Sequence, residues 1–357
     1  MTSSASHPSG PSFHDLLARV AARQDLSADE ARIAFDTIMS AGAPPVQVAA
    51  LLVALRVKGE CADELAGGVR ALRAAMIPVH APDPDSLVDT CGTGGGALTT
   101  FNISTAAALL AAAAGVRIAK HGNRSFTSRS GSADVLDALG VRIQLTPESM
   151  GAVLDEAGIV FMFAPLLHPA MKNVAPVRRE LGVTTVMNVL GPLTNPAGAR
   201  RQVVGVADPA ILDVVAGALH QLGHHRALIV HGQPGMDELS PVGPTDVVEV
   251  DGGGTRRYRL DPRELFGDVR FVADELAGEG PRENAALIMA VLEGRLRGAA
   301  RASVLLNAAA ALYVAGRAED LPAGIQLAER TIDEGQGTAA LERLRVASAR
   351  AEAEPLP

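Results

Sequence analysis

The sequence has no tryptophan, and aromatic residues make up only 3% of its 357 residues. A buried core must therefore be mostly aliphatic, which favours helices packed closely through small side chains. The only cysteines, Cys61 and Cys91, are too few for a disulfide framework and lack metal-ligand spacing, which indicates a reducing compartment. The apolar stretch 106–116 is too short to cross a bilayer, and the N-terminus lacks the pattern of a signal peptide. We therefore expect a cytoplasmic protein with no membrane partner.

The sequence also has fewer cationic residues than anionic residues. The chain has 32 Lys and Arg residues against 40 Asp and Glu residues, a net charge of −8. Proteins that bind nucleic acids in general rely on cationic side chains to neutralise phosphates, so we expect no nucleic-acid partner. A local basic site for a small phosphorylated molecule is still compatible with this charge.

The first part of the chain, residues 13–76, has the periodicity of consecutive helices. Ser27 with Glu30 three residues later forms a capping-box pattern, and Pro44 and Pro45 suit the first turn of another helix. These local signals predict a small unit of about four helices.

After Pro78 the pattern changes to strands that alternate with helices, which is typical of a mostly parallel sheet. The stretch 247–260, with three glycines at its centre, predicts an antiparallel hairpin. The C-terminal part predicts three helices, over 284–292, 300–315 and 325–344. The segment 168–190 interrupts the alternation because it looks helical, and it could rejoin the N-terminal helices in space.

The predicted fold class is α/β, with a helical N-terminal domain and a larger α/β domain whose mostly parallel central sheet is flanked by helices. We expect the chain to be divided as follows: a disordered tail over 1–11, a helical domain over 12–78 together with about 168–192, an α/β domain over 79–167 and 193–347, and a tail over 348–357.

A glycine-rich segment, Gly92–Gly96, follows the first predicted strand and precedes Asn102, Ser104 and Thr105. Glycines let the backbone approach an anion closely, and their N–H groups can surround phosphate oxygens. A simple tight connection is the alternative. The glycines also fit a dinucleotide fingerprint, but that fingerprint needs an acidic residue about 20 positions later, where this chain is basic.

A second polar segment, Lys120–Arg124, follows the next predicted strand, and Ser130–Asp134 comes shortly after it. Ligands of open parallel sheets bind at the carboxyl ends of strands, so both polar segments should meet at one edge. Cations and hydroxyls there suit a ligand with several phosphates. A solvated loop is the alternative.

Two further features are candidates for binding charged groups. Asp237 and Glu238 are adjacent carboxylates after a strand and suit Mg²⁺, although such pairs are often only solvated. Arg178 offers a planar fork for a carboxylate, although a helical arginine is more often a surface residue. The sequence has no Walker A motif, no nucleophile elbow and no metal-binding cluster of Cys or His.

Taken together, the motifs closely resemble those of the anthranilate phosphoribosyltransferase family. The matching segments occur in the family's order and are DTCGTGG, FNISTA, AKHGNRS with SGSAD, HPAMKNVAPVRRELG, NVLGPLTNPAG and GMDELSPVGPT. The resemblance covers roughly residues 13–345. It implies a nucleoside phosphorylase/phosphoribosyltransferase type of fold, a homodimer formed through the helical domain, and an active site between the domains.

The resemblance also implies the substrates and the residues that bind them. The reaction would transfer the phosphoribosyl group of phosphoribosyl pyrophosphate (PRPP) to the amine of anthranilate, in tryptophan biosynthesis, with two Mg²⁺ ions per site. The PRPP residues would be Gly92, Thr93, Gly94, Gly95, Thr100, Asn102, Ile103, Ser104, Thr105, Lys120 and Ser132. The anthranilate residues would be Gly92, His121, Gly122, Asn123, His168 and Arg178. The metal ligands would be Ser104, Asp237 and Glu238. No residue is assigned as a general base.

One position departs from the family pattern, because Gly96 stands where the family commonly has Asp. Two functions of related proteins are alternatives to the transferase. Pyrimidine nucleoside phosphorylases share the fold but have no use for a carboxylate partner such as Arg178. A nucleic-acid-binding relative should be basic and lack the PVRRELG segment, whereas this chain is acidic and contains it.

Overall fold

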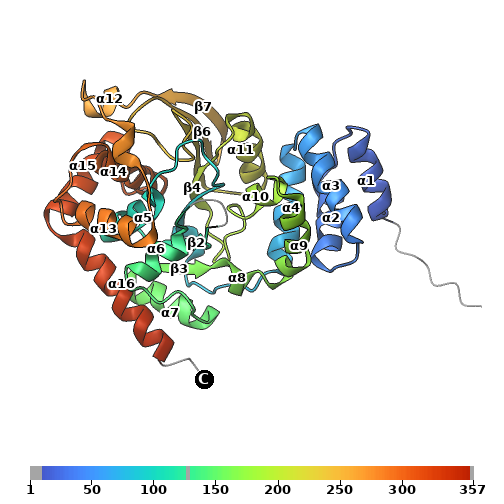
Figure 1. Ribbon diagram of the computed structural model, residues 1–357, viewed down its shortest axis with the longest axis horizontal. Helices are drawn as coiled ribbons and strands as arrows, with labels where there is room; N and C mark the ends of the chain where they lie inside the picture. The colour runs from blue at the N-terminus through green and yellow to red at the C-terminus, as the bar shows by residue number, and fades with distance from the viewer. Residues whose placement is uncertain (1–9, 126–128, 354–357) are drawn as a thin grey trace, which may run out of the picture.

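The computed structural model describes residues 10–125 and 129–353, so most of the tail predicted over 1–11 lies outside the described residues. Four helices come first: α1 (Phe13–Ala21), α2 (Ala28–Met39), α3 (Pro45–Lys58) and α4 (Ala62–Ala75). The predicted capping box begins α2, because the Ser27 hydroxyl accepts the Glu30 N–H and the Glu30 carboxylate accepts the Ser27 N–H. Pro45 lies in the first turn of α3. These helices form a bundle at the end of the molecule opposite the C-terminal helices (Figure 1).

The segment 168–190, predicted to be helical, is divided into three short helices. These are η2 (Pro169–Asn173), α9 (Ala175–Leu181) and α10 (Val186–Leu190). Gly182 ends α9 with a φ of 63°, a conformation that side chains other than glycine rarely adopt. The segment packs on the N-terminal bundle: Leu190 lies in the bundle's core, and Nδ2 of Asn173 donates to the Met39 carbonyl at 2.6 Å.

A seven-stranded sheet forms the centre of the larger domain, in the order β3-β2-β1-β4-β5-β6-β7. The strands are β1 (Val88–Gly92), β2 (Ile118–Gly122), β3 (Ile159–Phe163), β4 (Arg201–Gly205), β5 (Arg226–Gly232), β6 (Thr245–Asp251) and β7 (Gly254–Leu260). The first five strands in this order are parallel to one another. Strand β6 is antiparallel to β5, and β7 is antiparallel to β6. The predicted fold class and the predicted hairpin over 247–260 are both confirmed.

The sheet separates two hydrophobic cores. Val203 and Val204, adjacent on β4, point to opposite faces and belong to different cores. On one face pack α5 (Ile103–Ala113) and α14 (Gly298–Val314), which lie side by side although they are far apart in the sequence. On the other face α11 (Leu212–Gln221) packs between the sheet and α4, so that the helical bundle is joined to the sheet through it.

Two predictions about the C-terminal part are wrong. The helix expected over 325–344 is interrupted at Gly335, whose φ is 71°. The tail expected over 348–357 is helical as far as Ala353, because Ser348 is buried and its hydroxyl accepts the Arg142 N–H. The remaining elements are η1 (Pro84–Ser86), α6 (Ser132–Ala138), α7 (Pro147–Ala157), α8 (Ala164–Leu167), η3 (Pro209–Ile211), α12 (Arg263–Phe266), η4 (Ala273–Leu276), α13 (Pro281–Leu292), α15 (Leu321–Asp333) and α16 (Gln336–Ala353).

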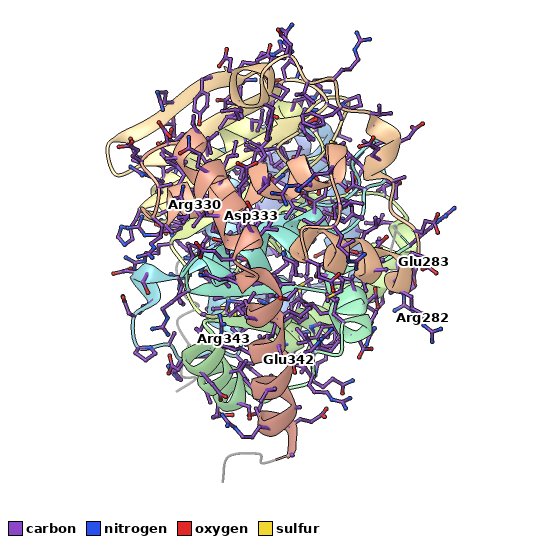
Figure 2. The ribbon with its side chains drawn as sticks, turned by 90° about the vertical axis from the view of Figure 1, so that its left-hand side faces the viewer. Arg282, Glu283, Arg330, Asp333, Glu342 and Arg343 are labelled. Carbon is purple, nitrogen blue, oxygen red and sulfur yellow. The ribbon has the colours of Figure 1, made fainter. Side chains whose placement is uncertain are left out.

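The outer face of the C-terminal helices carries exposed charges of both signs. Figure 2 labels six of them: Arg282, Glu283, Arg330, Asp333, Glu342 and Arg343. Cations and carboxylates are interspersed on α13, α15 and α16, so this face is an ordinary solvated surface. Among the described residues no helix is both long enough and apolar enough to cross a membrane.

Candidate active site

The glycine-rich segment after β1 and the acidic pair after β5 meet at the carboxyl edge of the sheet. The backbone N–H of Gly94 donates to Oδ2 of Asp237 at 2.9 Å, and the N–H of Ser104 donates to Oε1 of Glu238 at 3.3 Å. Parallel strands end at the same edge, which is why segments so far apart in the sequence converge here. The structure therefore brings together the residues predicted for the pyrophosphate and for the metal.

Close backbone approach explains the glycines in this region. A Cβ atom at Gly92 would lie 2.5 Å from Oδ2 of Asp237, and one at Gly205 would lie 1.5 Å from the Asp237 carbonyl oxygen. Gly95 has a φ of 81°, in the left-handed region. A Cβ at Gly96 would lie 2.8 Å from the Gly235 carbonyl oxygen in the facing loop. A glycine in place of the family's Asp therefore avoids a close contact with this loop.

The acidic pair lines a small cavity of about 10 Å³ together with Thr90 and Ser104, room for about one water molecule. Burial and, to a smaller extent, the neighbouring Asp237 charge raise the pKa of Glu238 to about 8, against the opposing Lys120 ammonium. Burial also raises the pKa of Asp237. Two adjacent, poorly solvated carboxylates have the chemistry of a site for a hard cation.

Lys120 is buried in the middle of β2 and bonds to two residues that line this cavity. Its ammonium donates to the Thr90 carbonyl and to Oγ of Ser104, the latter at 3.3 Å. Burial lowers the pKa of Lys120, while the charges of Asp89 and Glu238 oppose the decrease. A cation therefore lies next to the glycine-rich segment, where a phosphate group would need one.

A pair of histidines lies beside Lys120. The rings of His121 and His168 have their centroids 5.0 Å apart, and both side chains are buried. Burial lowers the pKa of His121 to about 3 and that of His168 to about 4, so both rings are neutral at pH 7. Neither Nε2 atom has a hydrogen-bond partner in the described part of the chain. Two predicted anthranilate residues thus form one apolar surface with free ring nitrogens.

The end of β2 lies against the start of α6. A Cβ at Gly122 would lie 2.3 Å from Oγ of Ser132, so only glycine fits there. The Ser132 hydroxyl donates to the Asn123 carbonyl at 3.3 Å. Gly122, Asn123 and Ser132 are therefore neighbours, as two converging loops require.

Other predicted residues have structural partners. Asn102 bonds to Ser130 and also accepts a hydrogen bond from Asn284 at 3.0 Å. Oγ1 of Thr93 accepts the Ala207 N–H. Three more are held by the fold around them: Thr100 forms a β-bridge with Ala277, and Ile103 and Thr105 are buried in α5. These side chains shape the loop, so any contact of Ile103 with a ligand would have to come from its backbone.

Arg178 lies on α9, on the helical side of the molecule (Figure 1). Its side chain is half-buried, and burial lowers its pKa. No hydrogen bond or ion pair joins its guanidinium to residues 10–125 or 129–353.

The prediction from sequence missed Asp89, which is fully buried within β1. The signal was available, since an aspartate inside an apolar strand is rarely buried without a specific partner. Its carboxylate accepts hydrogen bonds from the His121 N–H and from the Asn195 amide. Asn195 comes from the turn 191–196, which follows α10.

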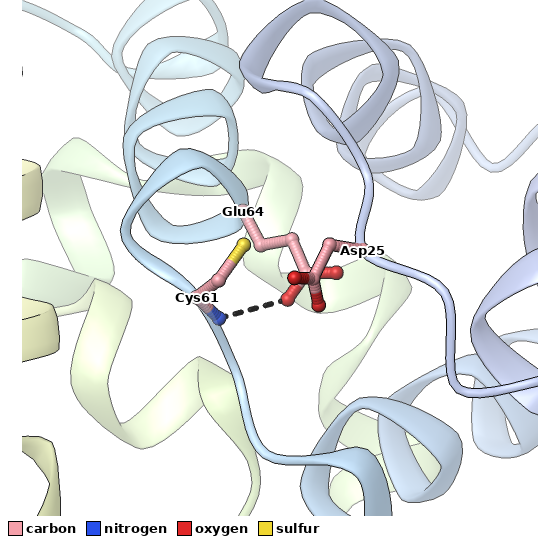
Figure 3. A group of neighbouring side chains, drawn as sticks. All are labelled: Asp25, Cys61 and Glu64. Atoms are coloured by element: carbon pink, nitrogen blue, oxygen red, sulfur yellow. Dashed lines mark hydrogen bonds between the residues drawn. The ribbon is translucent and has the colours of Figure 1, made fainter.

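A second group with metal-binding residue types lies in the helical bundle, at Asp25, Cys61 and Glu64 (Figure 3). Lys58 already neutralises it: its ammonium is 2.6 Å from Oδ1 of Asp25 and 3.0 Å from Oε2 of Glu64. Glu64 also accepts the N–H groups of Leu26 and Cys61. This group is a structural ion-pair cluster.

Comparison with known proteins identifies the family. Residues 84–338 match the α/β domain of a glycosyl transferase family, and residues 14–76 match the helical bundle domain of a glycosyl transferase family. The anthranilate phosphoribosyltransferase of Rubrobacter xylanophilus is 53% identical over 331 residues, which are 93% of this chain and 96% of the relative. The chain belongs to the anthranilate phosphoribosyltransferase family. The predicted enzyme class, a glycosyltransferase, is thereby confirmed.

Other members of the anthranilate phosphoribosyltransferase family agree in sequence and in structure. The Thermomicrobium roseum relative is 52% identical, covering 95% of this chain and 98% of its own length. The crystal structure from Thermus thermophilus is 44% identical with a TM-score of 0.88, covering 94% of this chain and 99% of that one. The Saccharomyces cerevisiae enzyme in complex with PRPP and Mg is 28% identical with a TM-score of 0.85, covering 95% and 98%.

Proposed function

We propose that this chain transfers the 5-phosphoribosyl group of PRPP to the amine of anthranilate, giving N-(5'-phosphoribosyl)anthranilate and pyrophosphate, as a step of tryptophan biosynthesis. The observation that carries this proposal is the meeting of the 92–96 backbone, the Lys120 ammonium and the Asp237–Glu238 pair at one sheet edge. A yeast family member bound to PRPP and Mg, with the same fold, supports it. The two free cysteines are consistent with a cytoplasmic enzyme.

The pyrophosphate of PRPP is proposed to bind between the glycine-rich segment and Lys120. Backbone N–H groups of the segment would bind phosphate oxygens, and the ammonium would neutralise part of their charge. Gly92 is needed for the close approach of this backbone to Asp237. The full set proposed for PRPP is Gly92, Thr93, Gly94, Gly95, Thr100, Asn102, Ile103, Ser104, Thr105, Lys120 and Ser132.

Magnesium is proposed as the cofactor, with two ions per site. Asp237 and Glu238 fit a divalent cation because their donors are oxygens, they are adjacent, and burial disfavours their charged forms. The Ser104 hydroxyl lies at the same cavity and would be a further ligand. When bound, magnesium would neutralise the pyrophosphate leaving group.

Anthranilate is proposed to lie against the histidine pair, with its carboxylate on Arg178. The neutral His121 and His168 rings offer an apolar surface for the aromatic ring. A yeast relative bound to 4-fluoroanthranilate, 27% identical with a TM-score of 0.83, supports an aromatic acid as the second substrate. The full set proposed is Gly92, His121, Gly122, Asn123, His168 and Arg178.

The residues contribute mainly by position and charge. Anthranilate's amine is neutral at pH 7, so its attack on C1 of the ribose needs no strong base, and we assign none. Positive charge that develops on the ribose is best stabilised by fixed dipoles and by the departing pyrophosphate, which Lys120 holds. Fixing both substrates in attack geometry supplies much of the remaining rate.

The test is loss of anthranilate fluorescence with purified protein, PRPP and Mg²⁺, each omitted in turn. The proposal expects loss only when all components are present. No loss by folded protein would contradict it. Phosphorolysis of thymidine or uridine in the same preparation would instead indicate a nucleoside phosphorylase.

We also propose that the protein is a homodimer formed through its helical bundle. Val46, Val53 and Val57 lie on one side of α3 and are exposed to 74%, 37% and 64%. Such an apolar strip on a surface helix favours contact with a second copy. Sedimentation should give twice the chain mass for the natural protein and the chain mass for Val46→Lys/Val57→Lys. A natural protein that sediments as a monomer at micromolar concentration would contradict the proposal.

A further inference from the structure

Asp89 lies in β1, between the neighbouring strands β2 and β4, and is fully buried. Both oxygens of its carboxylate are acceptors of hydrogen bonds. Oδ1 accepts the backbone N–H of His121 at 3.2 Å, and Oδ2 accepts Nδ2 of Asn195 at 2.8 Å. Nε2 of Gln202, on β4, lies 3.5 Å from the same Oδ2. One carboxylate therefore receives donors from two strands and from the turn 191–196.

This network fixes the turn 191–196 to the strands on either side of β1. Nδ2 of Asn195 also donates to the Ala119 carbonyl at 2.8 Å, which fixes the turn to β2. Nε2 of Gln202 donates to the Pro192 carbonyl at 3.2 Å, which fixes the turn to β4. The turn follows α10, which packs on the bundle with α9, the helix that carries Arg178.

Only an ionised aspartate satisfies this arrangement. The groups that face its two oxygens are all donors, so an asparagine would point its own NH₂ group at one of them. Burial raises the pKa of Asp89 to about 6, and the Lys120 ammonium is the largest influence that keeps the carboxylate charged. The side chain is inaccessible to ligands, so it cannot touch a substrate.

We propose that Asp89 is a positioning residue that couples the two halves of the active site. It holds Lys120 and His121 on β2 at a fixed place relative to the turn 191–196, and through that turn relative to α9, the helix that carries Arg178. The proposal rests on the proposed function, because it is the transfer reaction that requires both substrates to be held together. It predicts that Asp89 affects both substrates although it contacts neither.

The experiment compares steady-state kinetics of Asp89→Asn, Asn195→Ala and the natural protein. Asp89→Asn should raise the KM of both PRPP and anthranilate and lower kcat/KM roughly tenfold to hundredfold, because reacting groups would be misplaced. Asn195→Ala keeps the Asp89–His121 contact and frees only the turn. It should raise the KM of anthranilate several-fold more than that of PRPP.

A matched control is Asp85→Asn, the same chemical change at an exposed aspartate just before β1. It should leave all kinetic constants unchanged. A double-mutant cycle with Lys120→Met adds a readout that a purely structural role would not move. Asp89→Asn should weaken PRPP binding much less in the Lys120→Met background than in the natural protein, because Asp89 acts through Lys120.

Several outcomes would overturn the proposal. Asp89→Asn with a lowered melting temperature but unchanged constants for the folded fraction would show a structural role only, as would additive effects in the cycle. If Asp89→Asn does not fold, Asn195→Ala decides alone, and equal KM changes for both substrates would contradict the coupling. If the natural protein shows no transfer, the proposed function fails, and calorimetry with PRPP and Mg²⁺ still tests the positioning role. PRPP binding within twofold of natural in Asp89→Asn would then exclude it.

Discussion

The carboxylates of the helical bundle and those of the sheet edge are neutralised in different ways. In the bundle, Glu64 is fully buried, yet the Lys58 ammonium lies 3.0 Å from it. At the sheet edge, Asp237 and Glu238 are adjacent carboxyl groups, which accept backbone N–H groups from the glycine-rich segment and from the start of α5. The cluster in the bundle contains its own cation, Lys58, and we call it the complete cluster. The acidic pair at the sheet edge has no ion pair among the described residues, and we call it the incomplete cluster.

The pKa shifts of the charged groups also differ between the two clusters. Although burial opposes the charge of Lys58, its hydrogen bonds to Asp25 and Glu64 raise its pKa. At the sheet edge burial dominates, and it raises the pKa of Glu238 to about 8 and that of Asp237 as well. Carboxyl groups whose charged forms are disfavoured by burial are a mark of ligand sites, whereas completed ion pairs are a mark of structure.

The largest expected effect comes from neutralising the incomplete cluster. Asp237→Asn combined with Glu238→Gln should lower kcat/KM by about 10³ or more, because the leaving group would lose its magnesium. The free energy of unfolding without Mg²⁺ should not decrease, since burial disfavours the charged forms of both carboxyl groups that are replaced. Fluorescence assays over a range of Mg²⁺ concentrations and urea denaturation would measure both. Activity within fivefold of the natural protein would remove these residues from the metal site.

The complete cluster should respond in the opposite way. Glu64→Gln leaves Lys58 without its buried partner and should lower the free energy of unfolding by about 3 kcal/mol. The transfer rate of the folded protein and its Mg²⁺ dependence should not change. The matched control is Asp25→Asn, whose exposed side chain should contribute less than about 1 kcal/mol. A Glu64→Gln variant that is stable but inactive would contradict the distinction between the two clusters.

Arg178 is the counterpart of the incomplete acidic pair, because it is a cation that lacks a carboxylate partner among the described residues. Because Arg178 has no ion-pair partner among residues 10–125 and 129–353, Arg178→Ala should expose its role in binding substrate. The KM of anthranilate should rise roughly tenfold to hundredfold, with the KM of PRPP within about twofold. Arg179→Ala, at the exposed neighbouring position, is the control and should match the natural protein. Equal increases in both KM values would count against a carboxylate contact.

Local signals in the sequence were sufficient for much of the fold. The capping box at Ser27 and the proline at position 45 depend only on neighbouring residues, and both begin helices as predicted. The position of the glycine-rich segment at the carboxyl edge of the sheet was predicted from the strand that precedes it, whereas the presence of Asp237 at the same site was implied only by the family resemblance. The helix over 348–353 was missed because its stability depends on burial against α7 and on the contact of Ser348 with Arg142.

The parts of the site that could not be predicted depend on tertiary contacts. Asp89 and Asn195 are 106 residues apart, and neither residue alone indicates that they are bonded. The same limit applies to the acids, because Glu64 and Glu238 look alike in sequence. What distinguishes them is a lysine ammonium within 3.0 Å of Glu64, a distance that only the folded chain reveals.

The smallest expected effect concerns His168, a buried side chain that stays neutral in the folded protein. Burial lowers the pKa of His168 to about 4 in the folded protein. Between pH 6.5 and pH 4, this imidazole is therefore protonated in the unfolded chain and neutral in the folded chain. The unfolded state then binds more protons, and this histidine makes the protein less stable as the pH falls from 6.5 towards 4. Urea denaturation at pH 7.5 and 5.5 should therefore show a larger loss of stability for the natural protein than for His168→Gln, by about 1.4 kcal/mol. The control His220→Gln, at an exposed position on α11, should behave like the natural protein, and an equal loss in His168→Gln would show that the site does not keep His168 neutral.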